Sequence, residues 1–452
     1  MSPLFSAQNV ESLDESQVSK YHWRVVVTAG MGFFTDAYDL FIIGVVTAIL
    51  SPIWHLSTAQ LALLNGASLL SAALGALFFG MLADRFGRKK LYGLEVFILF
   101  IGAILSAVSS SFMWLLWSRI LVGFGIGGDY PSSAVIVSEH SGRKNRGFLV
   151  LLVFAMQAVG LVVGPLLASL LLATQLDPDW VWRILLGLGA IPAASVFYLR
   201  RTIKETPHFL KTQAAPYEVS RVISDLTGLT EALPPVVTYQ KQSLLSKRWL
   251  KCLIGTAGAW FLLDIAFYGN GVSSVLILET LSPHASLLRH TLLSAGMFLL
   301  FAFPGYFLAA KYVDTIGRKP LQIFGFTIMM VCFGIIAFTP GITQQLPFFM
   351  AVFGLSFFFV NFGPNTTTFL IPAEIYPANI RAKAHGISAA AGKVGAFIGA
   401  FFLPPLLESH GLAFVIGLMG VVSFFGILIT FLLPEMKHLS LDATETEAVY
   451  EH

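Results

Sequence analysis

The chain has 452 residues, of which 56% are hydrophobic and only 12% charged, with a mean hydropathy of +0.76 and a formal net charge of +3. So few charged side chains cannot cover the surface of a water-soluble protein, and the composition therefore predicts an integral membrane protein. The small net charge argues against a nucleic-acid-binding face. Cys252 and Cys332 lie in apolar segments and the ten histidines are scattered, so we expect no disulfide framework, metal site or cofactor.

Apolar segments long enough to cross a bilayer recur along the whole chain. At roughly twenty apolar residues per crossing, we count about twelve helices, expected near 24–50, 60–83, 91–109, 112–138, 147–174, 181–199, 250–280, 289–312, 320–339, 346–373, 384–407 and 411–433. Residues 1–22 are polar and lack the basic and apolar regions of a signal peptide, so we expect no cleavable signal. The predicted fold class is an all-α integral membrane protein.

One long polar segment divides the predicted spans into two equal groups. The predicted organisation is an N-terminal tail at 1–23, a six-helix bundle at 24–199, a linker at 200–249, a second six-helix bundle at 250–434 and a C-terminal tail at 435–452. Lysine and arginine gather in the linker and in the loops after even-numbered helices, whereas loops such as 51–59 and 175–180 contain none. Because basic loops remain on the cytoplasmic side, we expect both termini to be cytoplasmic, in a plasma membrane or a bacterial inner membrane.

The two predicted bundles resemble each other, as in transporters built from internal repeats. The segment Gly80-Met-Leu-Ala-Asp84-Arg85-Phe-Gly87-Arg88-Lys89 recurs in degraded form as Ala310-Lys-Tyr-Val-Asp314-Thr-Ile-Gly317-Arg318-Lys319. This pattern and the arrangement of spans resemble the major facilitator superfamily over essentially the whole chain, with two pseudo-symmetric bundles. Charged residues at corresponding positions of the two halves are expected to form a cytoplasmic gate, namely Asp84, Arg85, Glu139, Arg146, Asp314, Glu374 and Arg381.

Ionisable side chains occur inside the first and fourth predicted helices, where burial in lipid is costly and indicates function. Asp36 and Asp39 lie one helical turn apart, and two carboxylates in a low dielectric need a proton or a cationic partner. Arg119 is the candidate cation, in either a structural ion pair between helices 1 and 4 or a proton relay. Asp129, beside Tyr130, is expected to titrate into a cavity, and a silent pair with a neighbouring helix is the alternative.

Helices 5 and 7 carry further polar side chains at membrane depth. Trp260, Asp264 and Tyr268 recur every four residues and therefore share one helical face. The carboxylate in the middle of this stripe favours ligand or proton binding over simple core packing. Gln157 can donate and accept hydrogen bonds, and it fits helix packing and ligand contact equally well.

Helices 10 and 11 contain an amide and a lysine at a similar depth. A Gly-Pro step precedes Asn365 and frees backbone groups, which predicts either a simple kink or the lining of a cavity. Lys393 lies near the middle of the membrane and needs an anion. Either a carboxylate such as Asp264 or a substrate supplies it.

Five segments in order resemble the phosphate/proton symporters of the major facilitator superfamily, a group that includes fungal and plant high-affinity phosphate transporters. They are GMGFFTDAYDLF, GGDYPSSAVIVSE, W-x-x-x-D-x-x-x-Y, NFGPNTTTF and GISAAAGKVGA. The resemblance implies a phosphate site made of Tyr130, Gln157, Trp260, Asp264, Tyr268, Asn365 and Lys393. It also implies a proton route through Asp36, Asp39 and Asp129, with Arg119 beside it. Ser132-Ser133 and the short linker depart from the pattern but touch no expected ligand.

We therefore expect a secondary active transporter that takes up inorganic phosphate with protons by alternating access. Protonation of Asp264 would remove its repulsion of the anion and so couple the two fluxes. The expected partners are phosphate, protons and the lipid bilayer, without nucleic acid. A proton-coupled symporter of a carboxylate or aromatic acid is the alternative, because Lys393 suits any anion; a sugar or polyol porter and a phosphate-sensing receptor are weaker ones. We expect no enzyme, since the sequence contains no recognisable nucleophile–base set.

Overall fold

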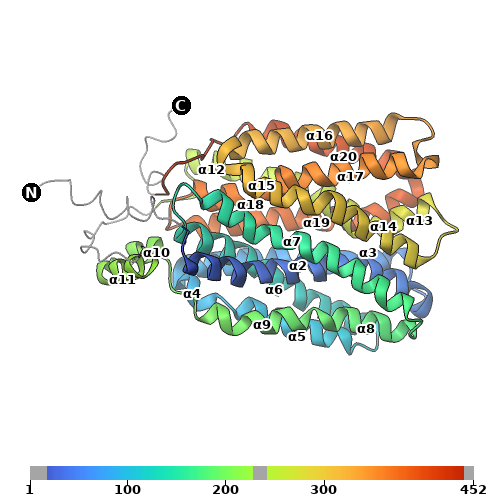
Figure 1. The fold of residues 1–452 in the computed structure, drawn as a ribbon, viewed down its shortest axis with the longest axis horizontal. Coiled ribbons are helices and arrows are strands. Elements are labelled where there is room, and N and C mark those ends of the chain that lie inside the picture. Colours follow the sequence, from blue (N-terminus) through green and yellow to red (C-terminus); the bar gives the residue numbers. More distant parts are fainter. Residues whose placement is uncertain (1–17, 228–241, 442–452) are drawn as a thin grey trace, which may run out of the picture.

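The computed structural model describes residues 18–227 and 242–441, and its long helices run side by side along the longest axis of the molecule (Figure 1). Within these ranges, 12 helical segments are long and apolar enough to cross a membrane, as predicted. The described residues contain no β-strand, which confirms the all-α class. The predicted tails and the middle of the predicted linker lie partly outside the described residues, at 1–17, 228–241 and 442–452.

The first half of the chain forms six spans, of which the third and the sixth are each built from two consecutive helices. Its helices are α2 (Lys20–Trp54), α3 (Thr58–Phe86), α4 (Arg88–Leu91), α5 (Leu94–Ala107), α6 (Phe112–His140), α7 (Arg146–Ala173), α8 (Pro178–Leu188) and α9 (Ala190–Arg201). Two short helices follow in the linker, α10 (Pro207–Thr212) and α11 (Pro216–Thr227). The sixth span extends two residues beyond the predicted boundary at 199, so Arg200 belongs to the membrane-spanning part and not to the linker.

The second half repeats this arrangement with more interruptions. Its elements are α12 (Lys247–Val272), α13 (Ser274–Leu281), α14 (Leu287–Met297), a π-helix η1 (Phe298–Ala302), α15 (Phe303–Ile316), α16 (Arg318–Phe338), a 3-10 helix η2 (Ile342–Gln344), α17 (Leu346–Phe362), α18 (Pro364–Ile375), α19 (Arg381–His410) and α20 (Leu412–Thr430). The tenth span breaks at Gly363, directly before Pro364, because proline cannot continue the backbone hydrogen bonds of α17. The seventh span ends at Val272 and continues as α13.

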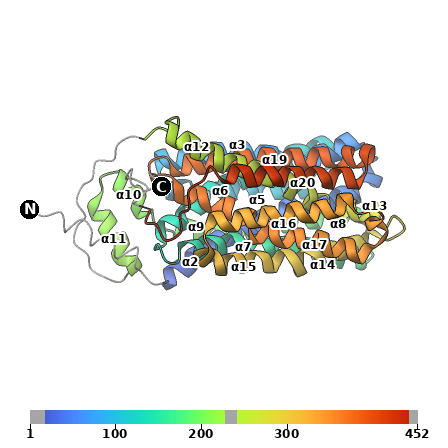
Figure 2. The same ribbon diagram turned by 90° about the horizontal axis from the view of Figure 1, so that it is seen from above.

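The two halves pack against each other along their whole length, one coloured blue to green and the other yellow to red (Figure 1). Across the interface, α3 packs against α19, and α7 packs against α14 and α15. α2 begins and α20 ends at the same end of the bundle, and α10 and α11 project beyond this end in both views (Figures 1 and 2). We call it the basic end, since it carries the Lys- and Arg-rich loops, and we call the other the opposite end.

Glycines allow the closest helix contacts within the first half. A Cβ atom at Gly127 on α6 would lie 2.0 Å from the carbonyl oxygen of Ala72 on α3, and one at Gly123 would lie 2.0 Å from that of Ser68. Small residues of this kind let membrane helices approach until their backbones touch. The α3–α6 contact holds α6 at the depth where it contributes Asp129 and Tyr130.

We expect Gly127→Ala to lower the melting temperature of the purified protein, because overpacking of a tight contact costs about 1–3 kcal/mol. Gly334→Ala on α16 is the matched control, since a Cβ there would meet no other atom within 4 Å. Thermal unfolding in detergent measures the difference, and equal melting temperatures for the two variants would contradict the packing argument.

Candidate functional site

A lysine ammonium lies between the two halves, near the middle of the spans. Lys393 on α19 is 1% exposed, and its Nζ donates to the hydroxyls of Tyr268 at 2.7 Å and Tyr130 at 3.0 Å. Nζ also lies 4.2 Å from the centroid of each tyrosine ring, so cation–π attraction adds to the hydrogen bonds. Oδ2 of Asp264 on α12 lies 3.6 Å away, close enough for an ion pair. These four residues were predicted to share a site, and the structure brings them together.

A chain of hydrogen bonds continues from Tyr130 through both halves. Gln157 Nε2 on α7 donates to the Tyr130 hydroxyl at 2.9 Å, and the Tyr306 hydroxyl on α15 donates to Gln157 Oε1 at 2.9 Å. Asn365 Nδ2 on α18 then donates to the Tyr306 hydroxyl at 2.6 Å. We call this group the polar cage: Tyr130, Gln157, Asp264, Tyr268, Tyr306, Asn365 and Lys393.

Tyr306 was not predicted from the sequence. Its hydroxyl connects Gln157 of the first half with Asn365 of the second, and its side chain is fully buried. A usable signal exists, because a phenol inside the apolar run FAFPGYFLAA must find a polar partner. Its partners, Gln157 in the other half and Asn365 in its own, lie far away along the chain, and sequence spacing gives no information about them.

Two layers of aromatic side chains enclose the polar cage. Toward the basic end, Phe154 and Phe369 stack with ring centroids 4.3 Å apart, and Trp260 lies 6.3 Å from Phe369. Toward the opposite end, Phe41 lies 5.3 Å from the Tyr268 ring and 6.0 Å from Phe298. Trp260, which was predicted as a ligand, therefore forms part of the inner wall. Because the walls keep water away, charge interactions inside the cage are stronger than in solvent.

A cleft of about 450 Å³ lies beyond the outer aromatic layer, toward the opposite end. Both halves line it, including Thr47 and Asn65 from the first half and Glu279 and His290 from the second. Between the cleft and the cage, α2 and α12 come so close that a Cβ at Gly44 would lie 2.2 Å from a backbone oxygen of α12. The cleft is thus a vestibule that ends at a closed contact.

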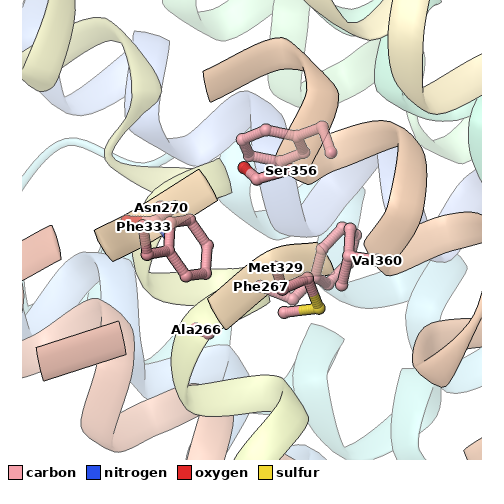
Figure 3. A pocket seen from close by; sticks show the side chains of 8 residues that line it. Ala266, Phe267, Asn270, Met329, Phe333, Ser356 and Val360 are labelled. Carbon is pink, nitrogen blue, oxygen red and sulfur yellow. The ribbon is translucent and has the colours of Figure 1, made fainter. Parts of the chain in front are cut away.

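A smaller cavity inside the second half is not large enough for a substrate. Figure 3 shows its lining, which comes from α12, α16 and α17 and includes Asn270, Met329 and Ser356. Its volume is about 10 Å³, roughly the space that one water molecule needs. The candidate substrate site is therefore the polar cage.

Of the two predicted carboxylate partners of Arg119, the structure pairs one, Asp39, and not the other, Asp36. Arg119 Nη1 lies 3.3 Å from Asp39 Oδ1, and its Nη2 donates to the backbone oxygen of Asp39 at 2.9 Å. This pair joins the first and fourth spans. Arg119 does not bond to Asp36, whose carboxylate is 1% exposed and has no hydrogen-bond partner for either oxygen. Asp36 is thus a buried carboxyl group without a bonded counter-ion among the described residues.

Asp129 has a partner that was not anticipated. Arg200 on α9 donates to both of its carboxylate oxygens, at 2.8 and 2.7 Å, and also to Glu95 Oε1 on α5 at 2.8 Å. The Ser133 hydroxyl donates to Asp129 at 2.5 Å. Asp129 therefore lies in a buried charge cluster and not at an open cavity.

Two sequence features explain why the partner of Asp129 was missed. Arg200 was counted with the linker because it stands beside Arg201 at the end of an apolar run. Gly32 on α2 is also needed, because a Cβ there would lie 1.8 Å from Arg200 Nη2 and 2.0 Å from Asp129 Oδ2. A glycine one helical turn before Asp36 is the only available hint of this close approach.

A buried carboxylate at the basic end joins the two halves. Glu139 on α6 accepts hydrogen bonds from Arg88 Nη2 at 3.1 Å and from Arg381 Nη1 of the second half at 2.7 Å. Glu374 on α18 repeats the arrangement, with Arg318 Nη2 at 2.8 Å and Arg146 Nε of the first half at 2.9 Å. Every one of these side chains is fully buried. We call the six residues the charged lock.

Two further carboxylates tie helix N-termini across the same interface. Asp84 accepts from the backbone N–H groups of Lys383 at 2.7 Å and Ala382 at 3.2 Å, at the start of α19. Asp314 accepts from the backbone N–H of Phe148 at 2.8 Å, at the start of α7. The positive end of a helix dipole favours a carboxylate at this position. The charged lock and these contacts close the basic end.

Arg85 is the one predicted gate residue that stays outside this network. Its side chain is exposed, and its guanidinium lies 5.2 Å from the centroid of the neighbouring Phe86 ring. Gly87, with a φ of 99°, ends α3 and precedes α4, so the chain turns there and brings Arg88 back toward Asp84. Arg88 therefore pairs with Asp84, at 3.2 Å, and takes the inward position that we assigned to Arg85.

Comparison with known proteins gives consistent results. A family model described as "Sugar (and other) transporter" matches residues 11–448. The chain is 36% identical to inorganic phosphate transporter 1-1 of Arabidopsis thaliana, and the alignment covers 98% of each chain. It is also 36% identical to low affinity inorganic phosphate transporter 1 of Petunia hybrida, over 97% of this chain and 95% of that one. The proton:xylose symporter XylE superimposes with a TM-score of 0.79 at 19% identity, over 94% of this chain and 98% of the other.

The match to a transporter family over nearly the whole chain and the identity to proteins named phosphate transporters define a secondary transporter of the major facilitator superfamily, and the fold agrees with this class. The family match extends over nearly the whole chain. The chain belongs to the sugar (and other) transporter family.

We expect Glu139→Gln to shift the protein toward a conformation that is open at the basic end. The substitution leaves two buried arginines without their shared carboxylate, and breaking a buried ion pair from one side costs about 3–5 kcal/mol. Spin labels on Arg85→Cys and Lys383→Cys, at the exposed ends of α3 and α19, should report longer and broader distances by double electron–electron resonance. Cys252 and Cys332 are replaced first.

Asp179→Asn is the control for this experiment. It removes a carboxylate from an ion pair with Arg183, at 3.0 Å, that is partly exposed at the opposite end. Label distances should then stay unchanged. Distances that also stay unchanged in Glu139→Gln would show that the charged lock does not hold the halves together.

Proposed function

We propose that the protein takes up inorganic phosphate together with protons, by alternating access of the polar cage to the two sides of a cell membrane. The observation that carries the proposal is the buried Lys393 ammonium, which is surrounded by hydroxyl and amide groups from both halves. The identity to proteins named inorganic phosphate transporters, over nearly the full length of both chains, supports the choice of substrate.

The chemistry of the polar cage suits a tetrahedral oxyanion. Phosphate accepts hydrogen bonds at every oxygen, and the cage offers donors of three kinds: an ammonium, phenol hydroxyls and carboxamides. In the structure these donors bond to one another. Lys393 donates to Tyr130 and Tyr268, and Asn365 donates to Tyr306. Phosphate would replace these internal bonds, and it would hold both halves together through the same side chains.

Competition for Lys393 couples a proton to the anion. The Lys393 ammonium balances the charge of Asp264, with Nζ 3.6 Å from Oδ2. Neither carboxylate oxygen of Asp264 has a hydrogen-bond partner among the described residues. When phosphate takes the ammonium, Asp264 must bind a proton or repel the anion. Proton binding therefore strengthens phosphate binding, and by linkage phosphate binding strengthens proton binding.

The charge cluster in the first half provides a second place for protons. Four buried carboxylates lie there, Asp36, Asp39, Glu95 and Asp129, and among the described residues two arginines bond to them, Arg119 and Arg200. Unpaired ionised carboxylates are too costly at this depth, so the cluster must hold protons in the closed state. Asp36, without a bonded cation, is the first candidate. A structural role for the Asp39–Arg119 pair is compatible with this assignment.

Alternating access requires the two closed ends to open in turn. We infer that the basic end is cytoplasmic, because its loops carry the Lys and Arg residues. The charged lock closes that side, and the vestibule at the opposite end marks the entry side. Opening the charged lock would expose the polar cage to the cytoplasm, where protons leave and Asp264 regains Lys393. A symporter of organic acids would use the same steps and remains the second candidate, since a carboxylate also matches an ammonium.

The direct test is uptake of radiolabelled phosphate into proteoliposomes, with and without an inward proton gradient. We expect gradient-stimulated uptake that arsenate inhibits and that excess sulfate, sugars and carboxylates do not. Lys393→Ala should lower uptake at least about 100-fold, because it removes the one positive charge of the polar cage, while the protein remains folded by thermal melting. Normal uptake by this variant, or inhibition by carboxylates, would reject phosphate as the substrate of the polar cage.

Asp264→Asn tests the coupling separately. The amide keeps the shape and polarity of the side chain but cannot exchange a proton, so we expect phosphate binding without proton-driven accumulation. Counterflow of labelled phosphate measures binding and exchange, and a gradient-driven assay measures accumulation. Accumulation at the wild-type level would assign the coupled proton to another group.

A further inference from the structure

A second cleft opens at the basic end, outside the membrane-spanning bundle. It lies between the end of α3 with α4 and the linker helices α10 and α11, which project beyond the bundle (Figures 1 and 2). Its volume is about 760 Å³, within the ~300–1,000 Å³ that small-molecule sites occupy. We call it the linker cleft. Neither wall contributes to the polar cage.

The linker cleft is positively charged on both walls. Arg85, Lys89 and Lys90 line it from the side of α3 and α4, and Lys204 and Arg221 line it from the side of the linker. Of these five residues, Lys204 pairs with Asp225. The other four make no ion pair with a carboxylate in the part of the chain that the structure describes.

The acidic residues in the lining do not cancel this charge. Glu205 is engaged by the backbone N–H groups of Arg88 at 3.1 Å and Lys89 at 3.2 Å. Burial raises the pKa of the Glu205 carboxyl, and the backbone donors and the Arg88 guanidinium act against this shift. Apart from the Lys204–Asp225 pair, the lining holds two carboxylates, Glu205 and Glu218, against four cations. Like charges around one concavity repel each other, and an anion between them removes that repulsion.

The linker wall is a folded structure that can hold a ligand. α11 places Val219, Val222 and Ile223 against Leu210 of α10, and these apolar residues form a small buried cluster. Arg221 and Tyr217 stand one helical turn apart on α11 and are both exposed in the lining of the cleft. Arg221, the cation on α11, is thus held in a fixed position relative to α10.

The same residues connect the linker cleft to the charged lock. Glu205 caps α4, whose first residue, Arg88, reaches Glu139. The Thr206 hydroxyl donates to Glu139 at 2.5 Å, and the Phe209 ring lies 4.9 Å from the Arg88 guanidinium. A ligand that joins α4 to the linker would therefore stabilise the position of Arg88 in the closed basic end.

We propose that the linker cleft binds a compact anion with several phosphate groups, and that binding favours the closed basic end. Lysine and arginine bind phosphate groups through charge-assisted hydrogen bonds. Such an anion can come from a soluble polyphosphorylated molecule or from the headgroup of an anionic lipid. The proposal goes beyond the transport function, because it concerns a regulatory site and does not depend on the solute that the polar cage carries.

Tripolyphosphate is the probe, and the full-length protein in phosphatidylcholine nanodiscs is the target. We expect the double variant Lys90→Gln/Arg221→Gln, with one change on each wall, to bind tripolyphosphate about tenfold or more weakly by isothermal titration calorimetry. The control Lys247→Gln/Lys251→Gln removes equal charge from exposed positions on α12 and should bind like the wild type. Lys393→Ala should also bind normally, because the polar cage is a separate site. Equal affinity of the double variant and its control, or loss of binding in Lys393→Ala, would overturn the proposal.

A second arm of the experiment distinguishes the two sources of the anion. Phosphatidic acid is added to the nanodiscs, and melting temperature is measured with and without tripolyphosphate. If phosphatidic acid raises the melting temperature of the wild type but not of the double variant, and tripolyphosphate does not bind, the ligand is a lipid headgroup. If tripolyphosphate binds and phosphatidic acid has no effect, the ligand is a soluble molecule. No effect of either probe rejects the site. These are binding measurements, so a failure of phosphate uptake would leave their outcome unchanged.

Discussion

An ammonium group far from water is stable only where other groups replace its hydration shell, and Lys393 meets this condition with tyrosine hydroxyls, tyrosine ring faces and one carboxylate. The other polar groups of the cage surround Lys393 and these partners. Tyr130 and Gln157 belong to one half and Lys393 to the other. The free energy of burying the Lys393 charge therefore depends on the relative position of the two halves. A solute that changes the partners of Lys393 therefore also changes the balance between conformations.

The contacts at the two ends of the bundle differ in kind. At the basic end, carboxylates of each half bind arginines and helix N-termini of the other. At the opposite end, backbone contact and aromatic side chains close the path below a vestibule. The hydrogen bonds within these ion pairs need a defined distance and angle, whereas aromatic side chains can stay in contact over a range of positions. The basic end should thus open in an all-or-none manner and the opposite end more gradually.

Features that depend on hydrophobic segments and internal repeats could be predicted from the sequence. The number of spans and the break at Gly363 follow from apolar segments, and the seven predicted residues of the cage and its wall follow from four-residue spacing and from the resemblance to phosphate symporters. The missing parts are contacts between distant segments. Tyr306, Arg200 and Glu95 each find partners in other helices, and the inward direction of Arg88 instead of Arg85 depends on the turn at Gly87. Hydrophobic pattern alone does not encode such pairings.

The short π-helix η1 determines which changes in length the eighth span can accept. A π turn amounts to one extra residue in an α-helix, so it resets the register of everything after it, including Tyr306 on α15. Deleting one residue between Phe298 and Ala302 would restore a regular helix and leave Tyr306 facing Gln157, whereas winding the same residues as an α-helix would rotate Tyr306 by about 100°. Point substitutions would leave that register intact. A deletion elsewhere between Leu287 and Tyr306 would rotate Tyr306, so the length of the eighth span is constrained outside η1.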